Sequence, residues 1–137
     1  MTKGNEFMRR DRYEGEIKFD NVSYSYPNQD SDAIENISFK IGKGERIGLV
    51  GRVGSGKTTI GKLITKLFLP QKGRISIDGI DIRQLDPSEI RENIGYVAQE
   101  PWLIAGTIEQ NISLGATDIK SEEIIEAANI STATEFM

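Results

Sequence analysis

Residues 46–59 have the sequence Arg-Ile-Gly-Leu-Val-Gly-Arg-Val-Gly-Ser-Gly-Lys-Thr-Thr. An apolar run ends there in a glycine-rich turn, and residues 51–58 match the pattern G-x-x-x-x-G-K-[ST] at every specified position. Glycines let the backbone adopt positive φ and bring its N–H groups close to phosphate oxygens. A helix that begins near Lys57 would direct the positive end of its dipole at the same anion. The stretch therefore predicts a strand, a phosphate-binding loop and a helix, in that order.

Each polar position of this loop has a predicted contact. Lys57 is expected to reach the β- and γ-phosphates of a nucleotide, and the Thr58 hydroxyl is expected to ligate Mg²⁺. Thr59 is expected to hydrogen-bond the α-phosphate, with an ordinary first-turn hydroxyl as the alternative. The other loop residues expected to line the phosphates are Gly51, Arg52, Val53, Gly54, Ser55 and Gly56. The alternative for the whole stretch, a glycine-rich turn without a ligand, is disfavoured by the strand and helix patterns that flank it.

The composition excludes several classes of protein. The 137 residues carry a net charge of −4, which suits one soluble domain with a modest core. Basic and acidic residues are interspersed, so the basic patch of a nucleic-acid-binding protein is missing. The absence of cysteine and histidine excludes disulfides, thiol chemistry and imidazole ligands. No apolar run approaches the roughly 20 residues that span a bilayer. The chain alone is expected to be soluble, and any membrane role has to come through a partner.

The segments before the loop predict a small antiparallel β-meander. Residues 16–20 and 22–26 alternate between apolar and polar side chains, and residues 34–41 supply a further strand pattern. Residues 1–14 are polar and are expected to be a linker or a disordered lead-in. Residues 47–50 are apolar at nearly every position, which is typical of a buried parallel strand.

The segments after the loop alternate between helix and strand patterns. Apolar side chains at helical spacing predict one helix that ends before Pro70, with Lys62 on its outer side. The members of this apolar face are Ile60, Leu63, Ile64, Leu67 and Phe68. Residues 74–78 predict a short strand and residues 94–97 a buried one. Asp86 is expected to cap a helix.

Two short helices are predicted near the end of the chain. Residues 107–113 show helical spacing of isoleucines. Ser121 is expected to cap a final helix with an acidic first turn. The buried side of that helix is expected to include Ile124, Ile125 and Ala128.

Together these segments resemble the nucleotide-binding domain of an ABC transporter, from about Gly15 onward. The matching segments, in the order of the family, are Phe-Asp-Asn-Val-Ser-Tyr-Ser-Tyr-Pro (19–27), Ala-Ile-Glu-Asn-Ile-Ser-Phe-Lys-Ile-Gly-Lys-Gly-Glu (33–45), Gly-Arg-Ile-Ser-Ile-Asp-Gly-Ile-Asp-Ile (73–82), Ile-Gly-Tyr-Val-Ala-Gln-Glu-Pro (94–101) and Gly-Thr-Ile-Glu-Gln-Asn-Ile (106–112). The last segment is typical of exporters. Residues 51–57 and 81–87 look most like type I protein-secretion exporters of toxins and adhesins.

The resemblance implies an α/β fold: a partial P-loop NTPase core with an N-terminal antiparallel β-subdomain and the start of the ABC helical subdomain, over residues 15–137. It implies that Tyr26 stacks on adenine, with a core or edge tyrosine as the alternative. It also implies an apolar contact from Ile34 beside the base, against simple core packing. Gln99 is expected to contact Mg²⁺ and the attacking water, against a polar loop residue. Lys57 and Gln99 are thus the residues expected to take part in catalysis, with ATP and Mg²⁺ as cofactors.

Several elements of the family are missing from the sequence. The signature loop Leu-Ser-Gly-Gly-Gln, the Walker B aspartate with its catalytic glutamate, and the switch histidine do not occur. Asp78 is better explained as a turn residue than as a Walker B aspartate. In the family these elements follow the segment that holds Gln99, so the chain is expected to be the N-terminal part of such a domain, truncated within the helical subdomain.

The resemblance implies an ATPase that couples ATP binding and hydrolysis to substrate export at the cytoplasmic face of the inner (plasma) membrane. Its expected partners are a second nucleotide-binding domain, as a homodimer, and the transmembrane domain of the exporter. The alternative is a nucleotide-binding fragment with no turnover by itself. A different P-loop enzyme, such as a small-molecule kinase, is disfavoured by the β-meander and the Gln99 segment. Trp102 has two open interpretations, a surface that faces the membrane domain or a locally packed indole.

Overall fold

The computed structural model describes residues 12–29, 31–100, 102–114, 116 and 118–131. It divides into an N-terminal unit that ends at Gly95 and a C-terminal unit that begins at Tyr96. Most of the expected lead-in over residues 1–14 lies outside the described residues, which include only residues 12–14 of it.

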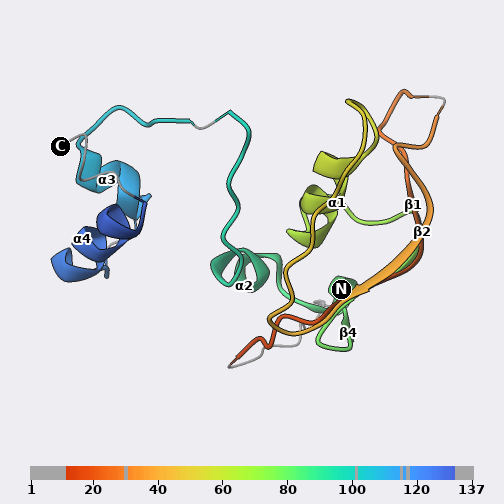
Figure 1. Ribbon diagram of the computed structural model, residues 1–137, viewed down its shortest axis with the longest axis horizontal. Coiled ribbons are helices and arrows are strands. Elements are labelled where there is room, and N and C mark those ends of the chain that lie inside the picture. The colour runs from red at the N-terminus through yellow and green to blue at the C-terminus, as the bar shows by residue number, and fades with distance from the viewer. Residues whose placement is uncertain (1–11, 30, 101, 115, 117, 132–137) are drawn as a thin grey trace, which may run out of the picture. The chain divides into compact units, whose positions relative to one another are not determined.

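A four-stranded antiparallel sheet forms the framework of the N-terminal unit, in the order β2-β1-β3-β4 (Figure 1). Its strands are β1 (Ile17–Tyr24), β2 (Ile34–Ile41), β3 (Lys72–Ile77) and β4 (Ile80–Asp81). The two alternating patterns before the first turn form one strand, β1, whose pairing shifts register near Asn21, a residue with φ 48°. Phe19 in β1 pairs with Phe39 in β2 and with Ile75 in β3, and its ring stacks on that of Phe39 at 4.5 Å. The predicted antiparallel β-subdomain is confirmed.

The hydrophobic core lies between this sheet and the helical segments of the same unit. The helices are α1 (Lys57–Ile64) and α2 (Pro87–Glu92), with a 3-10 turn, η1 (Ile82–Gln84), between β4 and α2. The largest fully buried side chains of the core are Phe19, Val22, Ile34, Leu63, Ile75, Ile82, Leu85 and Ile90. Strand, 3-10 turn and helix all contribute to this set, so α1 is fixed against the sheet by apolar burial.

Helix α1 ends earlier than the apolar periodicity predicts. Lys66 adopts φ 52°, and the N–H of Leu67 donates to the carbonyl of Lys62 at 2.9 Å while the N–H of Lys66 donates to Leu63 at 3.1 Å. These two bonds form a Schellman motif, which closes a helix at a left-handed residue. The left-handed position is usually glycine, so a lysine there gives no signal in the sequence. Leu67 is consequently 52% exposed rather than part of the buried face.

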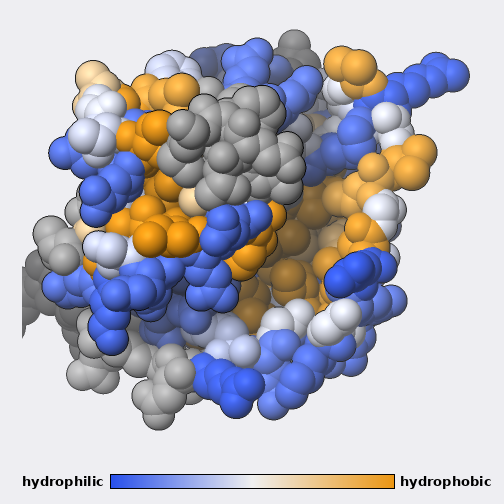
Figure 2. Space-filling model, turned by 60° about the vertical axis from the view of Figure 1, so that its left-hand side comes forward, coloured by the Kyte–Doolittle hydropathy of each residue, from blue (hydrophilic) through white to orange (hydrophobic). Residues whose placement is uncertain are grey.

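The two predicted buried strands, at residues 47–50 and 94–97, are wrong. Neither segment is a strand, and Val50 and Val97 are 99% and 95% exposed. A buried strand needs a hydrogen-bonded neighbour and covered faces, and no other strand among the described residues pairs with either segment. Ile94 is partly buried against the core, whereas the other apolar side chains of the two segments are solvent-exposed. Figure 2 shows orange hydrophobic side chains at the surface among blue hydrophilic ones.

The local capping and turn predictions around α2 are confirmed. The Asp86 carboxylate accepts the backbone N–H of Ser88 at 2.8 Å, and Pro87 is the first helical residue.

Asp78 lies in the turn between β3 and β4 with φ 49°. Its carboxylate accepts the backbone N–H groups of Glu14 and Glu16, both at 2.8 Å. Asp78 thus holds the chain that enters β1, as a turn residue does.

Removing the Asp86 cap is expected to lower the free energy of unfolding by about 1 kcal/mol. Asp86→Ala leaves the N–H of Ser88 without its carboxylate acceptor at the start of α2. Asp86→Asn keeps an acceptor oxygen and should restore most of the stability. Urea denaturation followed by circular dichroism measures both variants, and an alanine variant as stable as the parent chain would contradict the assignment of the cap.

The C-terminal unit contains α3 (Ile108–Ser113) and α4 (Ser121–Ile130). Thr107 caps α3, because its hydroxyl accepts the N–H of Gln110 at 3.1 Å while the Gln110 side chain accepts the N–H of Thr107 at 2.9 Å. Ser121 is the first residue of α4 rather than its cap; Lys120 occupies the cap position, and its N–H donates to Glu123 at 2.9 Å. Of the predicted buried side of α4, Ala128 is buried, whereas Ile125 is 59% exposed.

Candidate functional site

The glycine-rich loop meets α1 with the geometry of an anion-binding site. Gly54 and Gly56 have φ 82° and 86°, and α1 begins at Lys57, as the motif predicts. Gly56 occupies the cap position, no side chain caps the helix, and the first turn holds no acidic residue. The first N–H groups of α1 are therefore left for another acceptor, and the dipole favours a negative one.

The Lys57 ammonium points back into the loop. It donates to the carbonyls of Gly51 and Arg52, both at 2.7 Å, and to the Ser55 hydroxyl at 3.2 Å. A Cβ atom at Gly51 would overlap the Ser55 side chain, so the loop closes tightly on this lysine. Three oxygen acceptors hold the positive charge at the place where the motif predicts phosphate oxygens.

Thr58 and Thr59 face different surroundings. Thr58 is exposed, so its hydroxyl is accessible to a metal ion. Thr59 is only 4% exposed, and its hydroxyl lies 3.0 Å from the hydroxyl of Tyr26. The structure thus brings together Tyr26 and Thr59, two of the site residues predicted from distant parts of the sequence.

Tyr26 belongs to an aromatic cluster beside α1. Its ring is perpendicular to those of Tyr24 and Phe68, with centroids 5.2 and 5.5 Å away. The Lys62 ammonium lies over the Tyr26 ring, 5.9 Å from its centroid, and over the Phe68 ring at 5.7 Å. Lys62 lies outside the buried face of the helix, as predicted, but it is half-buried because its ammonium lies over these two rings. Burial raises the pKa of the Tyr24 phenol, and the neighbouring Tyr26 raises this pKa further.

Ile34 lies beneath the loop. It is 2% exposed, belongs to the core, and its Cγ1 would be 3.2 Å from a Cβ atom at Gly56. This position matches the core-packing alternative for Ile34. The Ile34 side chain packs beneath the phosphate loop and does not line the open surface of the loop.

Gln99 and Trp102 lie in the C-terminal unit, whereas the loop and Tyr26 lie in the N-terminal unit. Gln99 is exposed, and its contact to Mg²⁺ stays a prediction. Trp102 is 89% exposed, so the alternative of a locally packed indole is wrong. The role of Trp102 as part of a surface for a membrane domain stays a prediction.

The residues predicted to hold Mg²⁺ have suitable chemistry. A threonine hydroxyl and a glutamine carbonyl are oxygen ligands, which Mg²⁺ prefers together with phosphate oxygens and water. Among the described residues, no cluster of three or more acidic side chains could hold the ion by itself. The chemistry of each residue, taken separately, therefore fits a metal ion that arrives with nucleotide phosphates.

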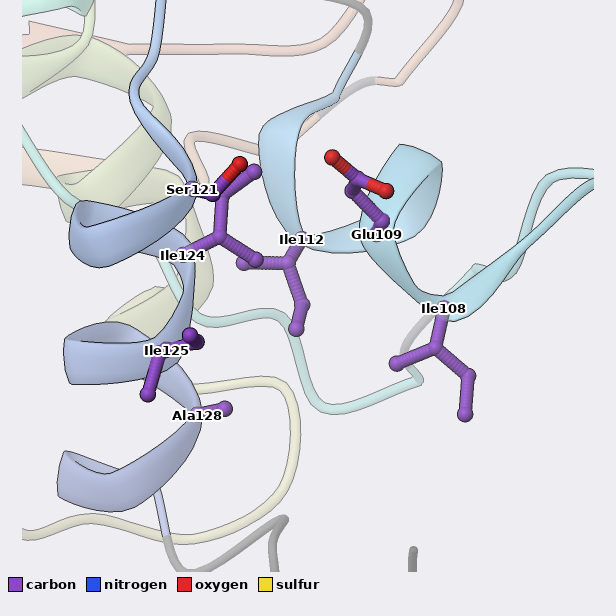
Figure 3. Close-up of a pocket in the computed structure, with 7 residues that line it drawn as sticks. All are labelled: Ile108, Glu109, Ile112, Ser121, Ile124, Ile125 and Ala128. Atoms are coloured by element: carbon purple, nitrogen blue, oxygen red, sulfur yellow. The ribbon is translucent and has the colours of Figure 1, made fainter.

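A groove between α3 and α4 lacks such chemistry. It has a volume of about 290 Å³, and Figure 3 shows Ile112 and Ile124 directed toward one another across it. Five of its lining residues are apolar, and only Glu109 and Ser121 are polar. An anionic ligand would meet a carboxylate rather than a cation there, so this groove is a poor candidate for phosphate.

Comparison with known proteins identifies the family. A family model described as ABC transporter matches residues 34–136. The chain belongs to the ABC transporter family. The match includes the loop and α1 as well as the segment with Gln99, although it begins after Tyr26.

Two relatives in this family are named as ATP-binding proteins of export or translocation. The chain is 38% identical to a putative multidrug export ATP-binding/permease protein of Bacillus subtilis, with 95% of this chain and 22% of the relative covered. It is 40% identical to the alpha-hemolysin translocation ATP-binding protein of Escherichia coli O157:H7, with 90% of this chain and 18% of the relative covered. The chain thus spans about a fifth of the length of these relatives.

A solved ABC exporter has the same fold. The structure of a bacterial Atm1-family ABC exporter with ATP bound matches with a TM-score of 0.88 and 31% identity, covering 98% of this chain and 23% of that one. The expected partial P-loop NTPase fold of an ABC transporter is confirmed. None of the helices in the described ranges has the length and apolar character required to cross a bilayer.

Sequence reasoning missed the contacts that surround Tyr26. The Thr59 hydroxyl and the Lys62 ammonium both approach Tyr26 from α1. One signal was available, because Thr59 and Lys62 are three residues apart and therefore share a helix face. Which residues this helix face contacts depends on the path of the chain between β1 and β2. The hydrophobic periodicity of the sequence does not predict that path.

Proposed function

We propose that this chain binds ATP with Mg²⁺ as the ATP-binding component of an ABC exporter. The observation that carries the proposal is the uncapped, acid-free N-terminus of α1 beside a loop whose Gly51 and Arg52 carbonyls hold the Lys57 ammonium. Phosphates would accept from the free N–H groups and from Lys57, which would exchange its loop carbonyls for phosphate oxygens. Thr58 would ligate Mg²⁺, and Tyr26 would stack on adenine.

The whole exporter would use this site in ATP hydrolysis. Gln99 would orient the attacking water beside Mg²⁺, which neutralises charge on the transferring phosphoryl group. A second nucleotide-binding domain, as a homodimer, and a transmembrane domain at the cytoplasmic face of the inner (plasma) membrane would be the partners. The exposed Trp102 suits the surface that faces the membrane domain. Similarity to the alpha-hemolysin translocation protein supports a protein-secretion exporter.

The 137-residue chain is expected to bind ATP but not to turn it over. Calorimetric titration with ATP and Mg²⁺ should give a dissociation constant in the micromolar to millimolar range. Phosphate release should stay at background, because the sequence lacks a Walker B glutamate to act as base. Base-free tripolyphosphate, titrated in parallel, separates binding at the loop from stacking of the base.

Two results would contradict the proposal in different ways. A titration without heat, together with a thermal midpoint that ATP does not change, would exclude nucleotide binding. Steady phosphate release that Lys57→Ala abolishes would instead show that the chain is a complete ATPase. A small-molecule kinase would require phosphoryl transfer to an added acceptor, which the same assay detects.

A further inference from the structure

The hydroxyls of Tyr26 and Thr59 link the two halves of the proposed nucleotide site. Tyr26 follows β1 and carries the ring proposed to stack on the base, whereas Thr59 lies in the first turn of α1, directly after the phosphate loop. Their oxygens are 3.0 Å apart, a normal hydrogen-bond length. Thr59 is 4% exposed, so water competes little for this bond.

The surroundings of Tyr26 restrict its ring further. Tyr24 and Phe68 hold it through perpendicular aromatic contacts, and Lys62 lies over one of its faces. A base would then stack on the opposite face. Both α1 side chains, Thr59 and Lys62, thus hold the ring in one orientation relative to the loop.

We propose that Thr59 is a positioning residue for the base-stacking ring: its hydroxyl ties Tyr26 to the first turn of α1, so that the base platform and the phosphate loop form one preorganised surface. This inference rests on the proposed ATP-binding function and assigns Thr59 a role toward the base. Because the ring is already fixed, less conformational freedom is lost when a nucleotide binds. The link contributes to affinity only for ligands that carry a base.

This role is compatible with a contact from Thr59 to the α-phosphate. A threonine hydroxyl has one donor and two acceptor sites, so it can accept from the Tyr26 phenol while it donates to a phosphate oxygen. The two roles differ in one measurable respect. Loss of a phosphate contact weakens tripolyphosphate and ATP alike, whereas loss of ring positioning weakens ATP alone.

The test is a double-mutant cycle with Thr59→Val and Tyr26→Phe, in which the affinities for ATP and for tripolyphosphate, each with Mg²⁺, are measured by calorimetry. Each single variant should bind ATP about threefold to tenfold more weakly, the range for one hydrogen bond. The double variant should be no weaker than the weaker single variant, because both substitutions remove the same bond. Tripolyphosphate affinity should change less than about twofold in Tyr26→Phe, within the scatter of such cycles, and Thr59→Val should weaken ATP binding clearly more than tripolyphosphate binding.

Matched controls separate positioning from folding. Thr59→Ser keeps the hydroxyl and should restore ATP affinity. Thr65→Val removes another buried hydroxyl of the same helical segment, one that donates to the Gly61 carbonyl, and should leave ATP affinity unchanged. If Thr59→Val does not fold, Tyr26→Phe carries the test, because it deletes one oxygen from a half-buried ring. Tyrosine ring resonances in the nucleotide-free protein should shift in Thr59→Val but not in Thr65→Val.

Distinct outcomes overturn the inference and the proposed function. Equal losses for ATP and tripolyphosphate in Thr59→Val would show that Thr59 acts on phosphate and would overturn the positioning role. Additive effects in the double variant, or single variants with unchanged ATP affinity, would overturn it as well. A parent chain that binds neither ligand would instead overturn the proposed function, and the inference with it.

Discussion

Lys57→Ala is expected to weaken ATP binding by about a hundredfold, or about 3 kcal/mol. Hydrogen bonds from a charged donor contribute about 1.5–3 kcal/mol each, and the lysine would donate to both the β- and γ-phosphates. In the unliganded chain the ammonium already lies among the loop acceptors, with Gly51 and Arg52 at 2.7 Å. When ATP binds, the ammonium would therefore exchange these two carbonyls for phosphate oxygens, and the side chain would not need to find a new rotamer. Calorimetric titration with ATP and Mg²⁺ measures the loss.

The matched control is Lys72→Ala, which removes the same charge from an exposed position at the start of β3. It should leave ATP affinity within about twofold, because Lys72 belongs neither to the loop nor to the contacts of the Tyr26 ring, and an exposed charge is screened by salt. Lys57→Met adds a further comparison, since it keeps most of the apolar stem and removes the ammonium. A folded Lys57→Ala variant with unchanged ATP affinity would contradict the assignment of the site.

Much of the N-terminal unit was predictable because local chemistry specifies it. The alternation in β1 and β2 produces an antiparallel pair whose faces are set by the period of two. Asp86 caps α2 through a side-chain oxygen that accepts the N–H of Ser88, two residues away, and such a contact does not depend on the rest of the fold. The G-x-x-x-x-G-K-[ST] pattern likewise encodes a loop and a helix start that depend on adjacent residues.

The wrong predictions concern segments whose structure depends on residues that are distant in the sequence. Residues 47–50 and 94–97 have the composition of buried strands, but composition does not supply a neighbour for their backbone groups. Helix α1 ends at Ile64, just before Lys66 adopts the left-handed conformation, and the Lys66 ammonium donates to the carbonyls of Arg83 and Leu85. The apolar periodicity continues through Leu67, so it could not predict where the helix ends.

The candidate site shows the same division. The loop glycines, Lys57 and the helix start follow from the motif, and resemblance to a family predicted Tyr26. The hydrogen bond between Tyr26 and Thr59 joins residues 33 positions apart and follows from the path of the chain around the core. The sequence therefore predicts the parts of the site, whereas their connection is visible only in three dimensions.

Gly56→Ala is expected to lower the free energy of unfolding by about 3 kcal/mol. Gly56 has φ 86°, and an L-residue in that region costs about 1–2 kcal/mol. A Cβ atom would also lie 2.5 Å from the Ala33 carbonyl oxygen and 3.2 Å from Ile34. These neighbours are backbone and buried core, so relief requires displacement of the start of α1, and overpacking of this kind costs about 1–3 kcal/mol. Urea denaturation measures the change.

Gly54→Ala isolates the packing component of this prediction. Gly54 has φ 82°, close to that of Gly56, but a Cβ atom there has no neighbour within 4 Å. Only the backbone cost of about 1–2 kcal/mol should remain. A larger loss in Gly56→Ala than in Gly54→Ala would mean that Gly56 seats the loop on the strand that begins at Ile34. Equal losses of unfolding free energy in the two variants would contradict this. Position 56 would then require glycine only because of its backbone conformation.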